Sequence, residues 1–349
     1  MQVIFKSMQQ EQKDVFRLGY KEIKKTLDLV LRKNGFTEEK ADLCSTLFTE
    51  TSLDGVYSHG LNRFPLFIEY VRRGYVKPEM EPSLIHSLQS FEKWDGNLGP
   101  GNLNATFCMD RAIQLARSTG TGIVSLRNTN HWLRGGSYGI QAAKQNCIGL
   151  CMTNTMPNMT PWGGQEPMIG NNPFIVSVPY EPYPILLDMA MSQYSYGKMQ
   201  ILKQEGKKLP SAGGFDKNLK LTDDPSEILE TMLGLPIGYW KGSGMAIMID
   251  LLVSLFSDGL TTFEIGNLGD ERSLSQLFMA FDLDRISEVS ARERIIHSIM
   301  GSLSDCDPIE KEGKVYYPGE QTWLRRKENE KSGIPVNPDT WKRIKELLS

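Results

Sequence analysis

The residues best suited to move a proton in this 349-residue chain are its four histidines, because an ordinary imidazole titrates near neutral pH. His297 lies in a charged helical pattern and His86 in a short apolar run, so we expect the first on a helix surface and the second at the edge of a strand. His59 and His131 lie instead in polar, glycine-containing turns. Either could be catalytic, and a hydrogen-bonded structural role is the alternative for each.

The neighbours of these two histidines suggest a site for a small acid. His59 belongs to a Tyr-Ser-His-Gly run at the entry of a predicted helix, and Arg63 follows four residues later. A guanidinium at that spacing can bind a substrate carboxylate beside a proton donor. His131 lies in a glycine-rich turn after a predicted strand, where α/β proteins often bind ligands.

The best candidate for an anion site is the run Tyr239-Trp-Lys-Gly-Ser-Gly244, immediately before a long apolar helix. Small residues there would let a phosphate approach backbone N–H groups at the helix start, and Lys241 adds a full charge. A plain glycine-rich helix entry with a solvated lysine is the alternative. The sequence has no Gly-x-Gly-x-x-Gly between a strand and a helix and no P-loop, so a dinucleotide would not bind in the usual Rossmann manner.

Metal and nucleophile chemistry is not indicated. Cys147 and Cys151 are four residues apart on a predicted strand, about 13 Å and too far to share a metal. No Gly-x-Ser-x-Gly occurs. Asp188 follows an apolar strand, and its carboxylate, which we expect to be buried, could hold a ribose or order a loop.

Helices and strands must position these residues. We expect three helices in the first 80 residues, with Leu43, Leu47 and Phe48 as the apolar face of the second, which Thr37 caps. From about residue 85, strands alternate with helices, which predicts an α/β layer fold. The predicted strands are 123–126, 148–152, 174–178, 185–187 and 276–281, the later helices are 106–117, 138–144, 245–257 and 339–348, and 209–216 is a surface loop.

Composition limits the class of protein. The 40% of hydrophobic residues is ordinary for a globular protein. The net charge of −3 argues against a protein whose whole surface binds nucleic acid or an anionic membrane. The start has no secretory signal pattern, and the longest apolar stretch, about twelve residues, is too short to span a bilayer. Five sparse cysteines are typical of reduced thiols. We therefore expect a cytoplasmic globular protein of about two domains.

Several long runs of the sequence resemble the type-2 malate/L-lactate dehydrogenase family of nicotinamide-dependent oxidoreductases, which is distinct from the Rossmann dehydrogenases. These runs are 55–65, 127–139, 169–173, 188–197 and 238–245. The resemblance implies a homodimer. It also implies a mixed-sheet α/β domain over 81–321 and a helical N-terminal region over 1–80, on which the C-terminal helices of 322–349 pack. The first dozen residues have no counterpart, and we expect a disordered extension there.

The resemblance also implies roles for individual residues. His59 would be the proton donor, Arg63 would bind the substrate carboxylate, and His131 would position or polarise the substrate. NAD(H) or NADP(H) would contact a strand and turn, a Trp-Lys pair and a C-terminal segment. These are Pro184, Ile185, Leu186, Leu187, Asp188, Met189 and Ala190; Trp240 and Lys241; and Gly319, Glu320 and Gln321. Similar enzymes carry Gly-His-Glu in the last segment, so only Gly319 matches there.

The implied reaction is reduction of a 2-keto sugar acid by hydride transfer, with a histidine supplying the proton. Asn130-His131-Trp132 is nearer to family members that act on a diketo sugar acid than to the lactate and malate members, which usually carry Asn-His-Phe. Malate, lactate, ureidoglycolate or a cyclic imino acid are the alternative substrates. A non-catalytic sugar-acid sensor and a helical interaction module are the alternative classes. The sequence does not distinguish NAD from NADP.

Overall fold

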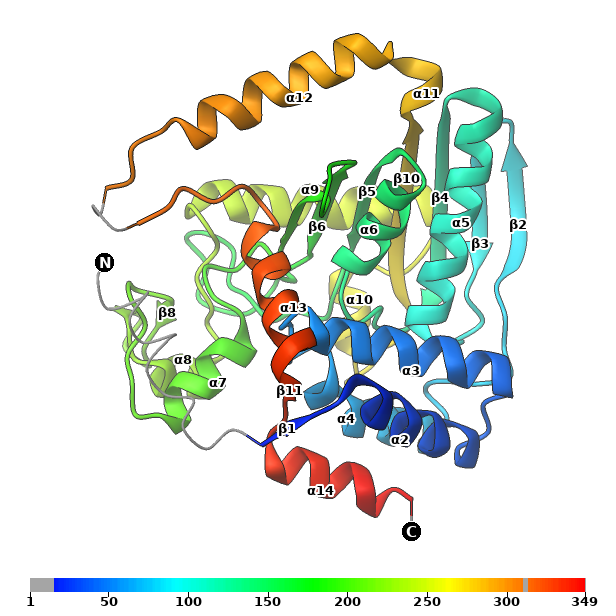
Figure 1. Ribbon diagram of the computed structural model, residues 1–349. Coiled ribbons are helices and arrows are strands. Elements are labelled where there is room, and N and C mark those ends of the chain that lie inside the picture. Colours follow the sequence, from blue (N-terminus) through cyan, green and yellow to red (C-terminus); the bar gives the residue numbers. More distant parts are fainter. Residues whose placement is uncertain (1–15, 310–312, 349) are drawn as a thin grey trace.

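The computed structural model describes residues 16–309 and 313–348, and it places a layer of helices against one end of a large sheet (Figure 1). The expected extension of the first dozen residues lies outside the described residues. Among the described residues, no helix is long and apolar enough to cross a membrane.

The helical layer combines both ends of the chain. A two-residue strand near the start, β1, pairs with β11 near the end, and α14 packs on α2 and α4. Buried residues of both ends therefore share one hydrophobic cluster, which includes Ile23, Phe48 and Trp341. We propose the division into a helical region and an α/β domain on this packing. The elements are β1 (Arg17–Leu18), α2 (Tyr20–Lys33), α3 (Glu38–Leu53), η1 (Leu61–Arg63), α4 (Phe64–Arg72), α13 (Glu320–Ser332), β11 (Ile334–Pro335) and α14 (Pro338–Glu346).

The three N-terminal helices are confirmed, and so is the Thr37 cap, whose side chain accepts from the backbone N–H of Lys40. The predicted apolar face of α3 is wrong at Leu43, which is 38% exposed. α3 instead buries Cys44, Phe48 and several small polar residues, because the serine and threonine hydroxyls donate to carbonyls of their own helix. The sequence pattern gave no sign that hydroxyl residues would line the core.

A seven-stranded sheet forms the rest of the molecule, with the order β2-β3-β4-β10-β5-β6-β7. Among the described strands of this sheet, β3 and β4 are parallel and every other neighbouring pair is antiparallel. The mixed α/β sheet is therefore confirmed. Its strands are β2 (Ser83–Leu88), β3 (Phe91–Asp95), β4 (Thr121–Thr129), β5 (Cys147–Thr153), β6 (Phe174–Val178), β7 (Ile185–Met189) and β10 (Leu274–Asp282).

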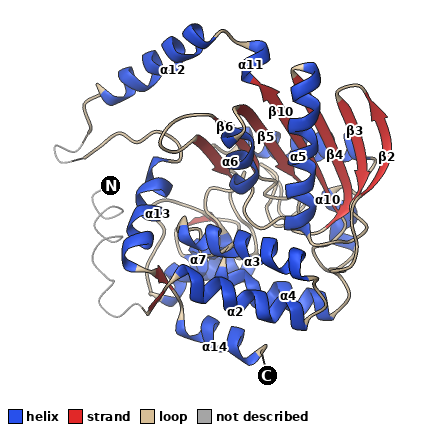
Figure 2. Ribbon diagram, turned by 45° about the vertical axis from the view of Figure 1, so that its right-hand side comes forward, coloured by secondary structure: helices blue, strands red, loops and turns tan. Residues whose placement is uncertain are grey.

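Helices cover both faces of this sheet, as Figures 1 and 2 show. Successive residues of the central strand β10 point to opposite faces, so Phe278 packs with α5 (Gly101–Thr119) and α6 (Gly136–Lys144), whereas Leu277 packs with α9 (Trp240–Ser257). The predicted helix 245–257 thus starts earlier than expected, at Trp240. The glycine-rich run is therefore the first turn of the helix rather than a segment before it.

Two parts project from this body (Figure 1). One is a lobe of α7 (Tyr196–Gln204), β8 (Gly214–Phe215), β9 (Leu221–Thr222) and α8 (Pro225–Thr231); the other is α12 (Val289–Ser304), which follows α11 (Leu283–Ile286). The predicted surface loop 209–216 is wrong in part, because Leu209 is 3% exposed in the lobe core and β8 lies within the segment. Glycines there allow close packing: a Cβ at Gly214 would lie 2.5 Å from a backbone oxygen.

Candidate active site

The structure brings His59 and His131 together although they are far apart in the sequence. Their rings stack with centroids 5.7 Å apart and planes inclined by 17°. His86 and His297 are exposed on β2 and α12, as predicted. The fold therefore separates the two candidate histidines from the other two.

His131 is held in a turn that follows β4. The side-chain amide of the preceding residue, Asn130, donates to the carbonyls of Tyr75, Leu98 and Gly99 at 2.9–3.0 Å. The backbone N–H of Leu133 donates to Nδ1 of His131 at 3.0 Å. Nδ1 is therefore an acceptor, and in the neutral ring the proton lies on Nε2.

His59 lies in the turn between α3 and η1. The hydroxyl of Ser58 lies 3.0 Å from Nδ1 of His59, and the backbone N–H of Leu61 donates to Ser52 Oγ of α3 at 2.9 Å. These contacts fix the turn to the helix. The ring nitrogen that does not face Ser58 is Nε2, which is free to exchange a proton with a ligand.

Burial makes both imidazoles weaker bases than usual. It is the largest cause that lowers the pKa of His59, and the positive charge of Arg63 lowers it further, whereas the carboxylate of Asp188 opposes the fall. Burial also lowers the pKa of His131 well below its ordinary value, with Arg63 and His59 adding to the effect. Both rings are therefore neutral in the free protein near pH 7.

Arg63 stands at the start of α4 and is partly accessible, with 28% of its side chain exposed. Its Nη2 donates to Oε2 of Glu271 at 3.1 Å. Its charge lowers the pKa of both His59 and His131, so Arg63 lies near enough to interact electrostatically with both rings. Sequence reasoning did not find Glu271, because it lies in the charged run Asp270-Glu271-Arg272, which is typical of a solvated turn.

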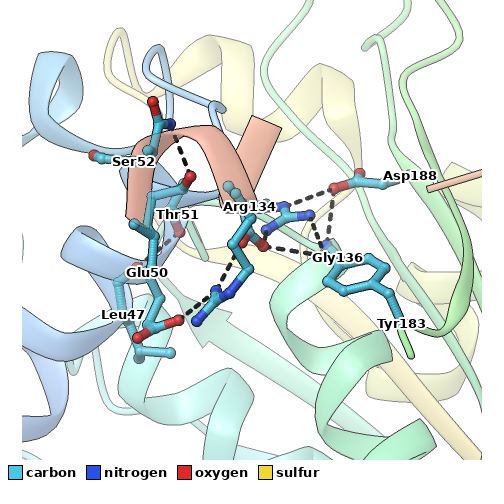
Figure 3. A network of polar contacts seen from close by, with 12 residues as sticks. Leu47, Glu50, Thr51, Ser52, Arg134, Gly136, Tyr183 and Asp188 are labelled. Carbon is cyan, nitrogen blue, oxygen red and sulfur yellow. Dashed lines mark hydrogen bonds and ion pairs between the residues drawn. The ribbon is translucent and has the colours of Figure 1, made fainter. Parts of the chain in front are cut away.

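Arg134 connects the site to the helical layer through a buried network (Figure 3). Its guanidinium, 3% exposed, bonds to Asp54, and its Nε lies 3.7 Å from Oδ2 of Asp188. Asp54 also accepts from Tyr183 at 3.1 Å and from Arg326 of α13 at 2.8 Å. Burial would lower the pKa of Arg134, but Asp54, Tyr183 and Asp188 raise it. The network ties α3, α13, β7 and the His131 turn together.

The prediction that Asp188 is buried is wrong, since 28% of its side chain is exposed. β7 is the last strand of the sheet, so one side of this residue has no neighbouring strand to cover it. Its Oδ2 accepts from the backbone N–H of Gly136 at 2.9 Å. One edge of the carboxylate is thus anchored at the start of α6, and the rest is accessible to a ligand.

The three segments expected to contact the cofactor lie around β7. Gly319, at the start of α13, is so close to β7 that a Cβ would lie 3.1 Å from Leu186 Cβ. The backbone N–H of Ile237 donates to Met191 just after β7, which brings the start of α9 alongside. Trp240 there is 65% exposed and Lys241 is also exposed, whereas Glu320 is paired with Lys314 and Gln321 is exposed.

The first turn of α9 differs in detail from the expected anion site. The N–H groups of Lys241, Gly242 and Ser243 donate to carbonyls of residues 238, 237 and 239. These three backbone donors are already used, and the exposed Lys241 ammonium is a group that could bind a phosphate. Within 16–309 and 313–348, no group of three or more His, Cys, Asp or Glu side chains is placed to hold a metal ion.

Comparison with known proteins identifies the family. A family model for malate/L-lactate dehydrogenases matches residues 18–345. The chain belongs to the malate/L-lactate dehydrogenase family. It is an oxidoreductase that acts on hydroxy or keto acids.

Individual relatives cover nearly the whole chain. It is 40% identical over 332 residues to the 2,3-diketo-L-gulonate reductases of Citrobacter koseri and Escherichia coli, which spans 95% of this chain and 100% of theirs. A solved malate dehydrogenase from Entamoeba histolytica superposes with a TM-score of 0.90 at 26% identity, covering 96% of this chain and 97% of the other. A sulfolactate dehydrogenase from Methanocaldococcus jannaschii gives 0.88 at 28% identity, covering 95% and 96%.

Proposed function

We propose that this enzyme reduces a 2-keto sugar acid with NADH or NADPH, and that its substrate is 2,3-diketo-L-gulonate, which becomes 3-dehydro-L-gulonate. The observation that carries this proposal is the stacked pair His59 and His131 beside Arg63. The reduction of a keto acid requires a proton donor, a hydrogen-bond donor for the ketone oxygen and a cation that binds the substrate carboxylate. His59, His131 and Arg63 could supply these three groups. The identity with diketogulonate reductases supports this choice of substrate.

In the proposed binding mode the substrate carboxylate lies on Arg63, and the adjacent ketone oxygen lies within reach of the Nε2 atoms at the edges of the two stacked imidazoles. Neutral His131 donates from Nε2 to the ketone oxygen, because Leu133 already occupies its Nδ1. His59 carries the proton that this oxygen takes up. The substrate carboxylate offsets the charge of Arg63, so the pKa of His59 rises on binding and the proton is available near neutral pH.

The residues around β7 fit a nicotinamide dinucleotide. An exposed indole at Trp240 offers a surface for a flat ring, and Lys241 offers a charge for a phosphate. Gly319 lets the start of α13 approach β7 closely, which brings the segment 319–321 to the same place. When bound, the reduced cofactor supplies the hydride for the ketone carbon. Pro184–Ala190, Trp240, Lys241 and the segment 319–321 would hold it. Asp188, accessible at the end of β7, would accept from a ribose hydroxyl.

We also propose that the enzyme is a homodimer. α9 buries one apolar stripe against the sheet and exposes a second, so its outer surface needs a partner. The exposed stripe is Met248, Leu251 and Leu255, which are 51%, 47% and 71% exposed. A groove of about 1590 Å³ also separates α12 from the body, and α12 has no buried residue in the single chain. A second copy, implied by the family resemblance, would cover these surfaces. Cytoplasmic location stays a prediction from the sequence.

The proposed reaction is tested by following NADH and NADPH oxidation at pH 6–8 with a panel of 2-keto acids. We expect fast turnover on 2,3-diketo-L-gulonate and much slower turnover on pyruvate, oxaloacetate and cyclic imino acids. Turnover on one of the others alone would keep the mechanism and change the substrate. No oxidation with any member, while the cofactor still binds, would contradict the proposal.

A further inference from the structure

Glu271 is largely buried and is paired with Arg63, unlike an ordinary surface carboxylate. It lies in the turn between α10 (Thr262–Asn267) and β10, and only 14% of its side chain is exposed. Its Oε2 accepts from Arg63, the residue that would bind the substrate carboxylate. A fixed negative charge therefore stands next to the positive charge that receives the substrate.

The turn that carries Glu271 is fixed on both sides. Both oxygens of Asp270 accept from Arg73 at 3.0 and 3.3 Å, and the phenol of Tyr70 bonds to the backbone of Glu271. On the other side, Ser273 donates to Asn128 of β4 at 3.3 Å. Arg63 and Tyr70 belong to the same short helical segment. The distance between Arg63 and Glu271 is thus set by packing and not by two mobile side chains.

This arrangement leaves two different groups side by side for a ligand. Among the described residues, Nη1 and Nε of Arg63 have no hydrogen-bond partner, and neither does Oε1 of Glu271. The guanidinium edge can bind a carboxylate. The carboxylate oxygen can accept from a hydroxyl of the same ligand, and it repels a second negative charge.

We propose that Glu271 determines specificity: it selects substrates that carry hydroxyl groups beside the keto acid and rejects those that carry a second carboxylate. This inference rests on the proposed function, because Arg63 must bind the substrate carboxylate. Glu271 acts by contact with the rest of the substrate and by orienting Arg63. A purely structural ion pair would instead change the binding of both kinds of ligand by the same factor.

The test compares Glu271→Gln with Asp270→Asn. The first keeps the shape and loses the charge beside Arg63; the second loses a charge on the same turn that pairs with Arg73 instead. Dissociation constants of L-gulonate, a polyhydroxy monocarboxylate, and malate, a dicarboxylate, are measured by calorimetry with NAD⁺ or NADP⁺ present. The decisive quantity is the ratio of the two constants, since a general loss of folding or affinity leaves it unchanged.

We expect the wild-type protein to prefer L-gulonate, and Glu271→Gln to reduce that preference about tenfold, the size of one hydrogen bond to a charged group. Asp270→Asn should leave the ratio within about twofold. An unchanged ratio in Glu271→Gln overturns the proposal, as does a wild-type protein that binds malate as well as L-gulonate or binds neither. Failure of the proposed reaction has a different signature, namely that no 2-keto acid causes oxidation of NADH or NADPH. The ratio of dissociation constants can still be measured in that case, because it requires binding and not turnover.

Discussion

At the scale of single residues, burial and neighbouring charge decide what each histidine can do. His59 and His131 stack, yet their partners differ: Ser58 faces Nδ1 of the first, whereas a backbone N–H donates to Nδ1 of the second. The second is therefore committed to donating from Nε2 while neutral. The first has no backbone N–H on Nδ1, which is compatible with a change of protonation state, and this difference supports the proposed roles.

The lowered pKa of His59 predicts how the reduction depends on pH. Free enzyme with protonated His59 is the form that reduces substrate, and its share grows as pH falls toward a pKa below the ordinary 6.5. We expect kcat/KM for reduction to rise as pH is lowered from 8 to about 6, and kcat/KM for oxidation of the hydroxy acid to fall. Steady-state kinetics in both directions measure this. Profiles that are flat, or that move in the same direction, would contradict the role of His59.

Arg134 and Asp54 form a buried ion pair, and a buried charge that loses its partner is strongly destabilising. Removing the arginine as Arg134→Met leaves the buried carboxylate of Asp54 without its closest partner, so we expect the free energy of unfolding to fall by about 3–5 kcal/mol. Urea denaturation measures the change. Arg111→Met, which removes a more exposed arginine from its pair with Glu92, should cost less. If the free energy of unfolding fell equally in the two variants, the buried network in Figure 3 would contribute no more stability than the more exposed pair of Arg111 and Glu92.

At the scale of elements, the sequence predicts the helices and strands well and the packing between them poorly. Apolar periodicity and the Thr37 cap locate α2, α3 and α4 and the strands β4, β5, β6, β7 and β10, because these signals are local. The inner strand β3 was not predicted. The pairing of His59 with His131 depends on how the end of β4 meets the helical layer, which no local signal contains. The exposed face of α9 and the buried hydroxyls of α3 were missed for the same reason.

Because α5 packs closely against the His131 turn, we expect a single methyl group added at Gly101 to have a strong effect on turnover and stability. A Cβ at Gly101, the first residue of α5, would lie 2.1 Å from the carbonyl oxygen of Asn130. We expect Gly101→Ala to displace the His131 turn, lowering both turnover and the melting temperature. Gly19→Ala, immediately before α2, where a Cβ would meet nothing within 4 Å, is the control and should leave turnover unchanged. Wild-type turnover in Gly101→Ala would show that the turn does not depend on this contact.

At the scale of the whole molecule, the outer side of α9 exposes the apolar side chains of Met248, Leu251 and Leu255. Leu255 of α9 is 71% exposed in the single chain. We expect light scattering after size exclusion to give the mass of a dimer for the wild-type protein and of a monomer for Leu255→Glu, because a buried charge would face the partner. Leu84→Glu on the edge strand β2, where the leucine is 50% exposed, is the control and should remain dimeric. A monomeric wild-type protein would contradict the dimer.

The proposed role of His59 is to supply the proton in an NAD(P)H-dependent reduction. Single-turnover reduction of 2,3-diketo-L-gulonate near pH 7 should be compared for the wild-type protein, His59→Ala and His86→Ala. We expect His59→Ala to be slower by about 10²–10⁴-fold, as loss of a general acid requires, and His86→Ala, which changes an exposed histidine of β2, to match the wild type. Turnover by folded, cofactor-binding His59→Ala at the wild-type rate would contradict the claim.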